Sequence, residues 1–329
     1  MIESVEFRNF RILRHTMLPL SRLTLIVGPN GSGKSTAIQA LQAVTSQSNL
    51  YFHGVVTVGL QPTDAARVEV LVHWGEPHQG DVTTMWWTPD SRLNPGPEPS
   101  PARLLRAQLG RMRSFSLAAS AIASPTQLVP DIELQPDGSH LAGVLDHLRD
   151  HDPEKFEVLN EELGRWLPEF DRILFDTPTT GQRSFVLRTR KGHHAIPASD
   201  LSQGTLFALT LLTLAYLPDP PPLVCLEEPD RGIHPRLLRR VQDALYRLSY
   251  PESCGETRQP VQVLATTHSP YFLDLFKDHP DEIVLAQKVG LEARFERLSD
   301  RPDIDEILEG APLGEIWYSG ILGGVPEEP

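Results

Sequence analysis

Short apolar runs alternate along this chain with segments whose apolar residues recur at helical spacing, a pattern that predicts a mixed α/β fold. The run Leu23–Val27 contains β-branched residues and is typical of a buried strand. Between Ala37 and Val44, apolar residues recur three and four positions apart, which predicts a helix. A glycine-rich segment, residues 28–36, joins the two. The sequence thus predicts a strand, a tight turn and a helix in direct succession.

The rest of the chain divides by the same two patterns. Apolar or alternating stretches predict strands at residues 1–22, 51–60, 66–74, 82–87, 173–175, 184–189, 222–228 and 261–268. Helical spacing predicts helices at residues 141–148 and 156–167. The longest apolar run, residues 206–217, is interpreted as a buried helix, and a further helix is expected at residues 236–248. A proline-rich stretch, residues 89–101, predicts an exposed loop or linker. The arginines that follow it are expected on one helix, as a solvated face or as a nucleic-acid contact: Arg103, Arg106, Arg111 and Arg113.

Composition and charge narrow the classes of function. Hydrophobic residues make up 40% of the 329 residues and charged residues 22%, as in an ordinary globular protein. The formal net charge of −13 argues against a protein that coats nucleic acid, and it leaves room for a local basic groove. The two cysteines, Cys225 and Cys254, lack the spacing of a metal site. Because the N-terminus does not resemble a signal peptide and the longest apolar run is too short to span a bilayer, we expect a cytoplasmic protein without a membrane anchor.

The glycine-rich turn forms the first candidate site. It matches the phosphate-binding pattern G-x-x-x-x-G-K-[ST] between a predicted strand and a predicted helix, which is the context that this pattern requires. These residues are expected to bind ATP: Gly28, Asn30, Gly31, Ser32, Gly33, Lys34, Ser35 and Thr36. Backbone N–H groups would turn toward the phosphates, Lys34 would reach the β- and γ-phosphates, and Ser35 would ligate Mg²⁺.

Three later segments complete the predicted ATP site. Ser202 and Gly204 open a strongly apolar helix, where a hydroxyl and free N–H groups suit a phosphate. The strand at 222–228 ends in two carboxylates. There Glu227 would hold Mg²⁺ through its water shell, and Glu228 would orient and activate the attacking water. His268 ends another predicted strand, and we expect it to contact the γ-phosphate.

The order of these motifs resembles that of the ATP-binding-cassette (ABC) class of P-loop ATPases. A narrower resemblance, to the AAA-family ATPases grouped with RecF, SMC heads and the OLD nucleases, covers most of the chain. It is carried by four segments: Phe7–Arg11, Gly28–Thr36, Glu228–Pro235 and Thr267–Pro270. This resemblance implies an α/β P-loop fold with a RecA-like core of ABC type, a β-rich edge lobe and a helical insertion lobe. The expected division is a core of residues 1–48 and 196–300, an inserted lobe of residues 49–195, and a C-terminal extension of residues 301–329.

The resemblance also implies a dimer in which two ATP molecules lie between two copies of the chain. Ser202 and Gly204 of one copy would contact the γ-phosphate held by Lys34 of the other. Glu228 would be the catalytic carboxylate and His268 the switch histidine.

The sequence departs from the family pattern at three points. Glu227 replaces the usual Asp, so the geometry around Mg²⁺ would differ slightly. The signature segment is Ser-Gln-Gly-Thr where Ser-Gly-Gly-Gln is usual. The glutamine usually found after the first lobe has Gln47 as its candidate.

Two functions fit these motifs. The first is an ATPase whose ATP-dependent dimerisation drives work on DNA, in repair or in defence against phage. The second is a nucleotide-gated regulatory scaffold that controls a separate effector protein such as a nuclease, and the acidic composition favours it slightly. The ATPase subunit of a transporter is disfavoured because roughly 170 residues separate the P-loop from the signature segment.

Overall fold

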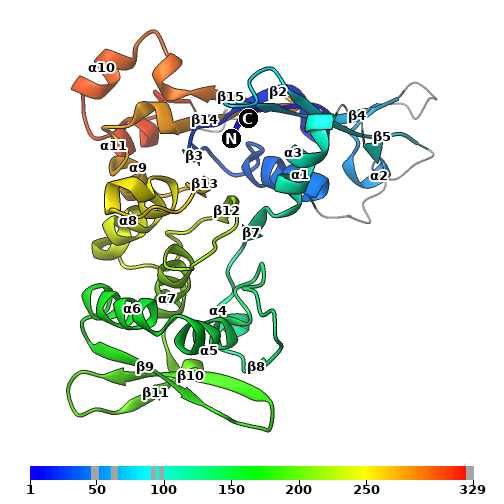
Figure 1. The fold of residues 1–329 in the computed structure, drawn as a ribbon. Helices are drawn as coiled ribbons and strands as arrows, with labels where there is room; N and C mark the ends of the chain where they lie inside the picture. The colour runs from blue at the N-terminus through cyan, green and yellow to red at the C-terminus, as the bar shows by residue number, and fades with distance from the viewer. Residues whose placement is uncertain (46–51, 61–65, 90–93, 96–99, 324–329) are drawn as a thin grey trace. The chain divides into compact units, whose positions relative to one another are not determined.

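The computed structural model describes residues 1–45, 52–60, 66–89, 94–95 and 100–323, and it has a mixed α/β architecture with parallel and antiparallel sheets (Figure 1). The chain forms two compact units. The first contains Met1–Ser114, Pro221–Leu226 and Ser249–Pro329, and the second contains Phe115–Pro220 and Glu227–Leu248. The domain boundaries expected from the sequence stay a prediction.

A six-stranded sheet carries the phosphate-binding turn. Its order is β15-β14-β3-β13-β12-β7. The strands have these bounds: β3 (Leu23–Val27), β7 (Arg113–Phe115), β12 (Leu223–Glu227), β13 (Gln262–Thr267), β14 (Ile283–Val289) and β15 (Glu292–Arg297). The central strand β3 is fully buried and pairs in parallel with both β13 and β14. A strand buried on both faces reads as a continuous apolar run, which is why it was recognisable in the sequence.

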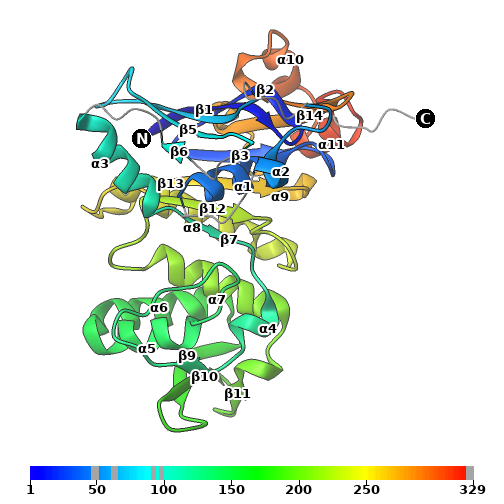
Figure 2. The ribbon, with the colours of Figure 1, turned by 90° about the vertical axis from the view of Figure 1, so that its right-hand side faces the viewer.

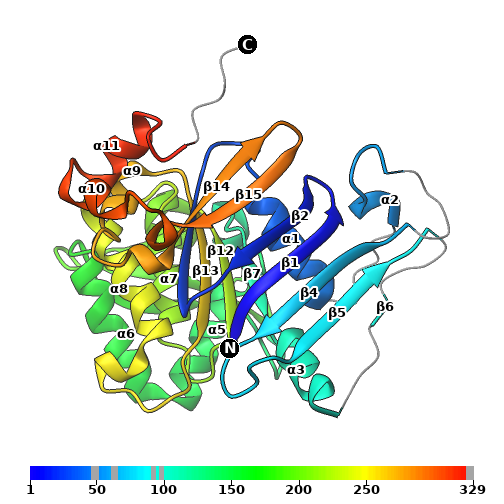
Figure 3. The ribbon, with the colours of Figure 1, turned by 90° about the horizontal axis from the view of Figure 1, so that it is seen from above.

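An antiparallel sheet of order β2-β1-β4-β5-β6 forms the second layer of the first unit, as Figure 3 shows. Its strands have these bounds: β1 (Ile2–Phe10), β2 (Leu13–Pro19), β4 (Val68–Trp74), β5 (Val82–Trp87) and β6 (Asn94–Pro95). Helix α1 (Lys34–Thr45) contributes to one hydrophobic cluster with residues from both sheets, including Cys225. Helix α3 (Ser100–Gly110) packs on α1 and on β5. This shared cluster fixes α1, and therefore the turn that precedes it.

The outer face of the antiparallel sheet bears a partly buried carboxylate. Glu6 on β1 is 9% exposed, and it accepts hydrogen bonds from Arg8 Nε at 2.7 Å and lies 3.1 Å from His15 Nε2. Burial by itself raises the pKa of Glu6, but the hydrogen bonds and charges of Arg8 and His15 outweigh it, so the pKa lies below its ordinary value. Glu6 therefore stabilises the fold in its ionised form.

Three further helices of the first unit follow β13 and β15. They are α9 (Pro270–Asp274), α10 (Ile304–Glu309) and α11 (Leu313–Tyr318). Helix α11 packs on α9, where the N–H of Gly314 donates to Asp274 Oδ1 at 2.7 Å. Within the described ranges, no helix is both long enough and apolar enough to cross a membrane.

The second unit combines helices with a small antiparallel sheet (Figure 2). The helices are α4 (Ala119–Ile122), α5 (Leu141–His151), α6 (Pro153–Trp166), α7 (Gln203–Ala215) and α8 (Leu238–Ser249), the last of which ends one residue inside the first unit. The strands are β8 (Thr126–Gln127), β9 (Phe170–Asp176), β10 (Gln182–Thr189) and β11 (Ala195–Pro197). Every residue of α7 from Thr205 to Ala215 is buried, which confirms the expectation of a buried helix.

Two expectations of local structure are wrong. Residues 51–60 do not form a strand in their described part, because Phe52 and Val55 lie on the helix α2 (Phe52–Val55), where both are buried three positions apart. The four arginines of 103–113 do not share one helix. Helix α3 ends at Gly110, a poor helix former, so Arg111 lies in a turn and Arg113 in β7.

Candidate functional site

The phosphate-binding turn joins β3 to α1 as its sequence predicts. Its lysine is 5% exposed, and Lys34 Nζ donates to the carbonyl oxygens of Gly28 at 2.7 Å and Pro29 at 2.9 Å. The amine is therefore held inside the turn at the N-terminus of α1. Ser35 follows it in the first turn of the helix and is exposed. Helix N-termini favour anions, so the turn has the charge and the donors that a phosphate group requires.

Close packing fixes the path of this turn. A Cβ added to Gly28 would lie 2.2 Å from the carbonyl oxygen of Ala286 on β14, so a larger residue cannot fit there. Gly33 has a φ of +100°, and a Cβ at that position would lie 2.7 Å from the Cβ of Ala293 on β15. The turn therefore packs directly on the hairpin of β14 and β15, which leaves no room for side chains at Gly28 and Gly33. The sequence pattern did not predict this contact.

Strand register brings His268 to the turn. In the parallel pair of β3 and β13, Thr267 lies opposite Val27. His268 follows Thr267 as Gly28 follows Val27, so these two residues leave the sheet side by side. His268 is partly exposed. His268 therefore lies beside the phosphate-binding turn, and its contact with the γ-phosphate stays a prediction.

The two predicted carboxylates lie at the end of β12, within the second unit. Glu227 is its last residue, and Glu228 directly follows. Glu228 has a φ of +49°, an unusual conformation for a glutamate. The N–H of Arg231 donates to the carbonyl of Glu228 at 2.9 Å and closes a turn around it. Backbone strain at a carboxylate that follows a buried strand is typical of a functional position.

The signature segment opens helix α7 in the same unit. Ser202 is the N-cap, and its hydroxyl accepts from the N–H of Thr205 at 3.1 Å. A Cβ added to Gly204 would lie 2.5 Å from the carbonyl oxygen of Gly232, which follows the Glu228 turn. The signature segment thus packs directly on the segment after β12. Ser202 and the following Gln203 are exposed, as an intermolecular contact would require.

The residues present suit ATP and Mg²⁺. Among the described residues, no three His, Cys, Asp or Glu side chains are grouped to hold a metal ion by themselves. Mg²⁺ is usually bound by one or two side chains together with substrate phosphates and water, so a cluster of three is not required. Ser35 and Glu227 stay the predicted ligands. Gln47, the candidate for the family's glutamine, lies outside the described residues.

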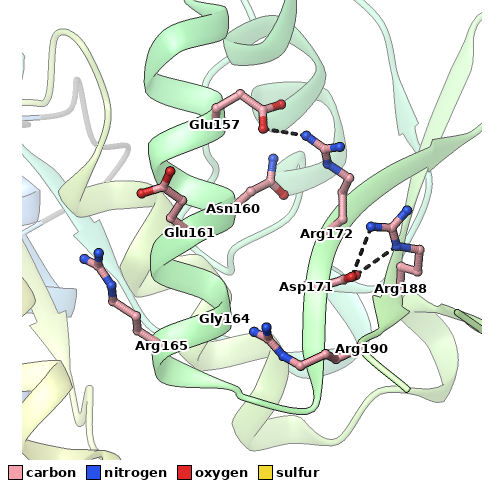
Figure 4. A pocket seen from close by; sticks show the side chains of 9 residues that line it. All are labelled: Glu157, Asn160, Glu161, Gly164, Arg165, Asp171, Arg172, Arg188 and Arg190. Atoms are coloured by element: carbon pink, nitrogen blue, oxygen red, sulfur yellow. Dashed lines mark hydrogen bonds and ion pairs between the residues drawn. The ribbon is translucent and has the colours of Figure 1, made fainter. Parts of the chain in front are cut away.

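A cavity of about 440 Å³ lies elsewhere, between α6 and the hairpin of β9 and β10 (Figure 4). Four of its charged side chains form two ion pairs. Arg188 forms two hydrogen bonds with Asp171 at 2.8 and 3.0 Å, which lower the pKa of that carboxyl, and Arg172 pairs with Glu157. None of the sequence-predicted site residues lines this cavity. We interpret it as a structural ion-pair network.

Similarity to known families agrees with this site. A family model described as "AAA domain, putative AbiEii toxin, Type IV TA system" matches residues 75–274, which is more than half of the chain. The chain belongs to this AAA-domain family. A second model, described as "AAA ATPase domain", matches residues 1–79, a range that includes the phosphate-binding turn. These matches confirm the AAA-ATPase relationship that the motifs indicated, and they support ATPase activity of the ABC type.

Individual proteins also share sequence or fold similarity with this chain. The OLD nuclease of Thermus scotoductus (strain ATCC 700910 / SA-01) is 23% identical over 372 residues, an alignment that covers 95% of this chain and 68% of that protein. An Smc head domain bound to the C-terminal domain of ScpA from Pyrococcus furiosus superposes with a TM-score of 0.61 at 15% identity, covering 94% of this chain and 99% of that one. The SMC head domain of Thermotoga maritima gives a TM-score of 0.50 at 17% identity, with 90% and 98% covered. At these identities the structures show the fold alone, and they confirm the ABC-type P-loop class.

Sequence reasoning assigned no role to one residue of this AAA domain that contacts the candidate site. Arg231 lies within the motif that carries the family resemblance, and it reaches Glu228 only through the folding of the turn. The guanidinium of Arg231 also lies over the ring of Phe207 and donates to the carbonyl oxygen of Leu117, and neither residue is a neighbour in the sequence. No local pattern could have identified these partners.

Proposed function

We propose that this protein binds and hydrolyses ATP in a dimer that encloses two nucleotides between two copies of the chain. The observation that carries the proposal is the turn between β3 and α1. There a buried lysine amine and a helix N-terminus meet at the carboxyl end of the parallel strands β3 and β13. His268 leaves the neighbouring strand at the same edge. Anion-binding groups at the carboxyl ends of parallel strands are the usual location of a nucleotide in an α/β fold.

Each proposed role follows from the chemistry of the side chain. The backbone N–H groups of residues 30–36 and the amine of Lys34 would bind the phosphates, and Ser35 and Glu227 would hold Mg²⁺. When bound, Mg²⁺ would offset negative charge on the phosphates. Glu228 would accept a proton from the attacking water, and His268 would donate a hydrogen bond to the γ-phosphate.

The exposed signature segment supports the dimer. Ser202 and Gln203 lie at the N-terminus of a 13-residue helix and face solvent. A helix N-terminus with an exposed hydroxyl suits a phosphate supplied by a second copy. Ser202 and Gly204 would then contact the ATP held by Lys34 of that copy, so hydrolysis would require both chains.

Glu228→Gln tests the proposal because it removes the base and keeps the shape of the side chain. This variant should bind ATP normally and hydrolyse it more slowly, by a factor on the order of 10² to 10⁴. Because ATP then persists, it should accumulate as a dimer with ATP and Mg²⁺ in light scattering. Adding Ser202→Arg, which places a cation in the partner's phosphate site, should return it to monomers that still bind ATP.

Ser199→Arg is the matched control for that second change. Ser199 is an exposed serine three residues before Ser202, so it introduces the same side chain outside the signature segment. The control should leave the ATP-dependent dimer intact. If Glu228→Gln stays monomeric at every ATP concentration, the two-chain site is wrong for this protein.

The work that ATP hydrolysis drives has two candidate forms. The first form is a role in DNA repair or phage defence. It is supported by the similarity to an OLD nuclease and by the family description, which names a type IV toxin–antitoxin system. The net charge of −13 favours the alternative, a regulatory scaffold that controls a separate effector such as a nuclease.

DNA binding distinguishes these forms. Arg106 is partly exposed on α3, and Arg111 is exposed in the turn that follows it. No acidic residue lies between Arg103 and Arg113 in the sequence. If DNA binds here, Arg106→Glu with Arg111→Glu should weaken binding and reduce its dependence on salt concentration. If wild type lacks measurable DNA affinity at moderate salt, the scaffold form is favoured.

A further inference from the structure

The turn after β12 contains an arginine that connects the proposed catalytic carboxylate to the signature helix. Arg231 Nη1 lies 4.0 Å from Glu228 Oε2. That distance is too long for a hydrogen bond, so the attraction is electrostatic. The two side chains are 46% and 37% exposed, which leaves both able to move when a nucleotide or a second chain arrives.

Two further contacts fix the guanidinium. Arg231 Nη2 donates to the carbonyl oxygen of Leu117 at 2.6 Å. The guanidinium carbon also lies 5.5 Å from the ring centre of Phe207, within the range of a cation–π interaction. Phe207 is buried and belongs to helix α7, which begins directly after Ser202. One planar group therefore contacts the carboxylate, a backbone carbonyl and the signature helix together.

We propose that Arg231 is a positioning residue that holds Glu228 for ATP hydrolysis and couples it to the signature helix. The inference rests on the proposed function, since it assigns Arg231 a role in that same reaction. Glu228 also has a left-handed backbone conformation, which persists only where the surrounding structure supports it. The turn bond from the Arg231 N–H to the Glu228 carbonyl fixes the spacing of the two side chains.

The packing of the signature segment gives the coupling a physical route. Gly204 lies so close to Gly232 that a Cβ would come within 2.5 Å of its carbonyl oxygen. Gly232 follows Arg231 directly. A displacement of the first turn of α7 would therefore move the segment that carries Arg231, and with it Glu228. In the proposed dimer, ATP bound by one copy would in this way influence hydrolysis in the other.

Arg231→Ala tests the inference in the full-length protein. We expect kcat for ATP hydrolysis to fall roughly tenfold to a hundredfold, as for other losses of catalytic positioning. The Kd for ATP, measured with a fluorescent ATP analogue, should change by no more than about twofold, because Arg231 does not contact the P-loop in this proposal. Arg231→Lys should recover only part of kcat, since an ammonium group lacks the planar fork that serves three partners. Arg236→Ala, at an exposed arginine five residues later, is the matched control and should behave as wild type.

A double-mutant cycle separates positioning from a general structural effect. If Arg231 acts through Glu228, then in the Glu228→Gln background the Arg231→Ala change should lower the residual rate by less than about twofold. If Arg231→Ala fails to fold, as judged by thermal unfolding, Arg231→Gln replaces it in the same cycle, because the amide removes the charge and keeps a polar side chain.

The outcomes decide between the two proposals. An Arg231→Ala enzyme with the kcat of wild type overturns the inference, as do equal fold-losses in both backgrounds. In either case ATP hydrolysis by the wild-type protein leaves the proposed function standing. A wild-type protein that binds ATP and does not hydrolyse it, alone or with DNA, overturns the proposed function and this inference with it.

Discussion

The packing of Gly204 against Gly232 makes Gly204→Ala a demanding test of the signature segment. The added methyl carbon would lie 2.5 Å from the Gly232 carbonyl oxygen and 3.5 Å from its carbonyl carbon. Ordinary contact begins at 3.4 Å, so the helix and the turn must separate by 3.4 − 2.5 = 0.9 Å. Both partners are backbone, and neither can rotate away as a side-chain tip would.

This displacement has two expected effects. Forcing a methyl group into a filled site lowers the free energy of unfolding by about 1–3 kcal/mol. A shift of this size in a segment that we propose contacts the partner's ATP should lower the rate of hydrolysis by up to roughly a hundredfold. ATP binding should be little changed, because the residues proposed to hold it belong to the P-loop.

Three measurements check this prediction: the free energy of unfolding in urea, the ATPase rate, and the Kd for ATP. Gly54→Ala serves as the control, because a Cβ added to Gly54 on α2 meets no atom within 4 Å. A Gly204→Ala protein with the stability and rate of wild type would show that the contact with Gly232 does not constrain the signature segment. Loss of ATP binding would show instead that Gly204 belongs to the site of its own chain.

Two further predictions concern the first unit. Lys34→Ala should weaken ATP binding roughly 30-fold to 4,000-fold, because loss of a buried charged partner costs about 2–5 kcal/mol and each 1.4 kcal/mol is tenfold in Kd. An ATP titration measures this loss, and Lys155→Ala, at an exposed lysine on α6, is the control. Glu6→Gln should lower the free energy of unfolding by about 1–3 kcal/mol at neutral pH. Because the pKa of Glu6 is lowered in the folded state, its contribution is present above the ordinary pKa of a glutamate and disappears as the pH falls through the folded value. Urea unfolding at neutral and acidic pH should show the difference shrinking in acid, and a difference independent of pH would contradict the assignment.

Much of the fold could be predicted because its signals are local. The P-loop strand, its turn and its helix are adjacent in sequence, and burial on both faces gave β3 an uninterrupted apolar run. Helices α5, α6 and α7 were equally visible from their apolar spacing. One error arose because a short apolar segment fits both a strand and a helix, as at Phe52 and Val55. The other arose because helix α3 ends at Gly110, before Arg111 and Arg113.

The sequence by itself determined the chemistry of the candidate site, since the residue types and their order specify a phosphate-binding turn, a carboxylate pair and a signature segment. Only the tertiary structure decided what surrounds them. The register of β13 against β3 places His268 beside Gly28, and the β14 hairpin confines Gly28 to a glycine. Arg231 joins Glu228 to Phe207 on helix α7 and to Leu117, which lies 114 residues earlier in the chain. These contacts depend on how distant segments pack, and a local pattern of residues carries no record of which distant segment it will meet.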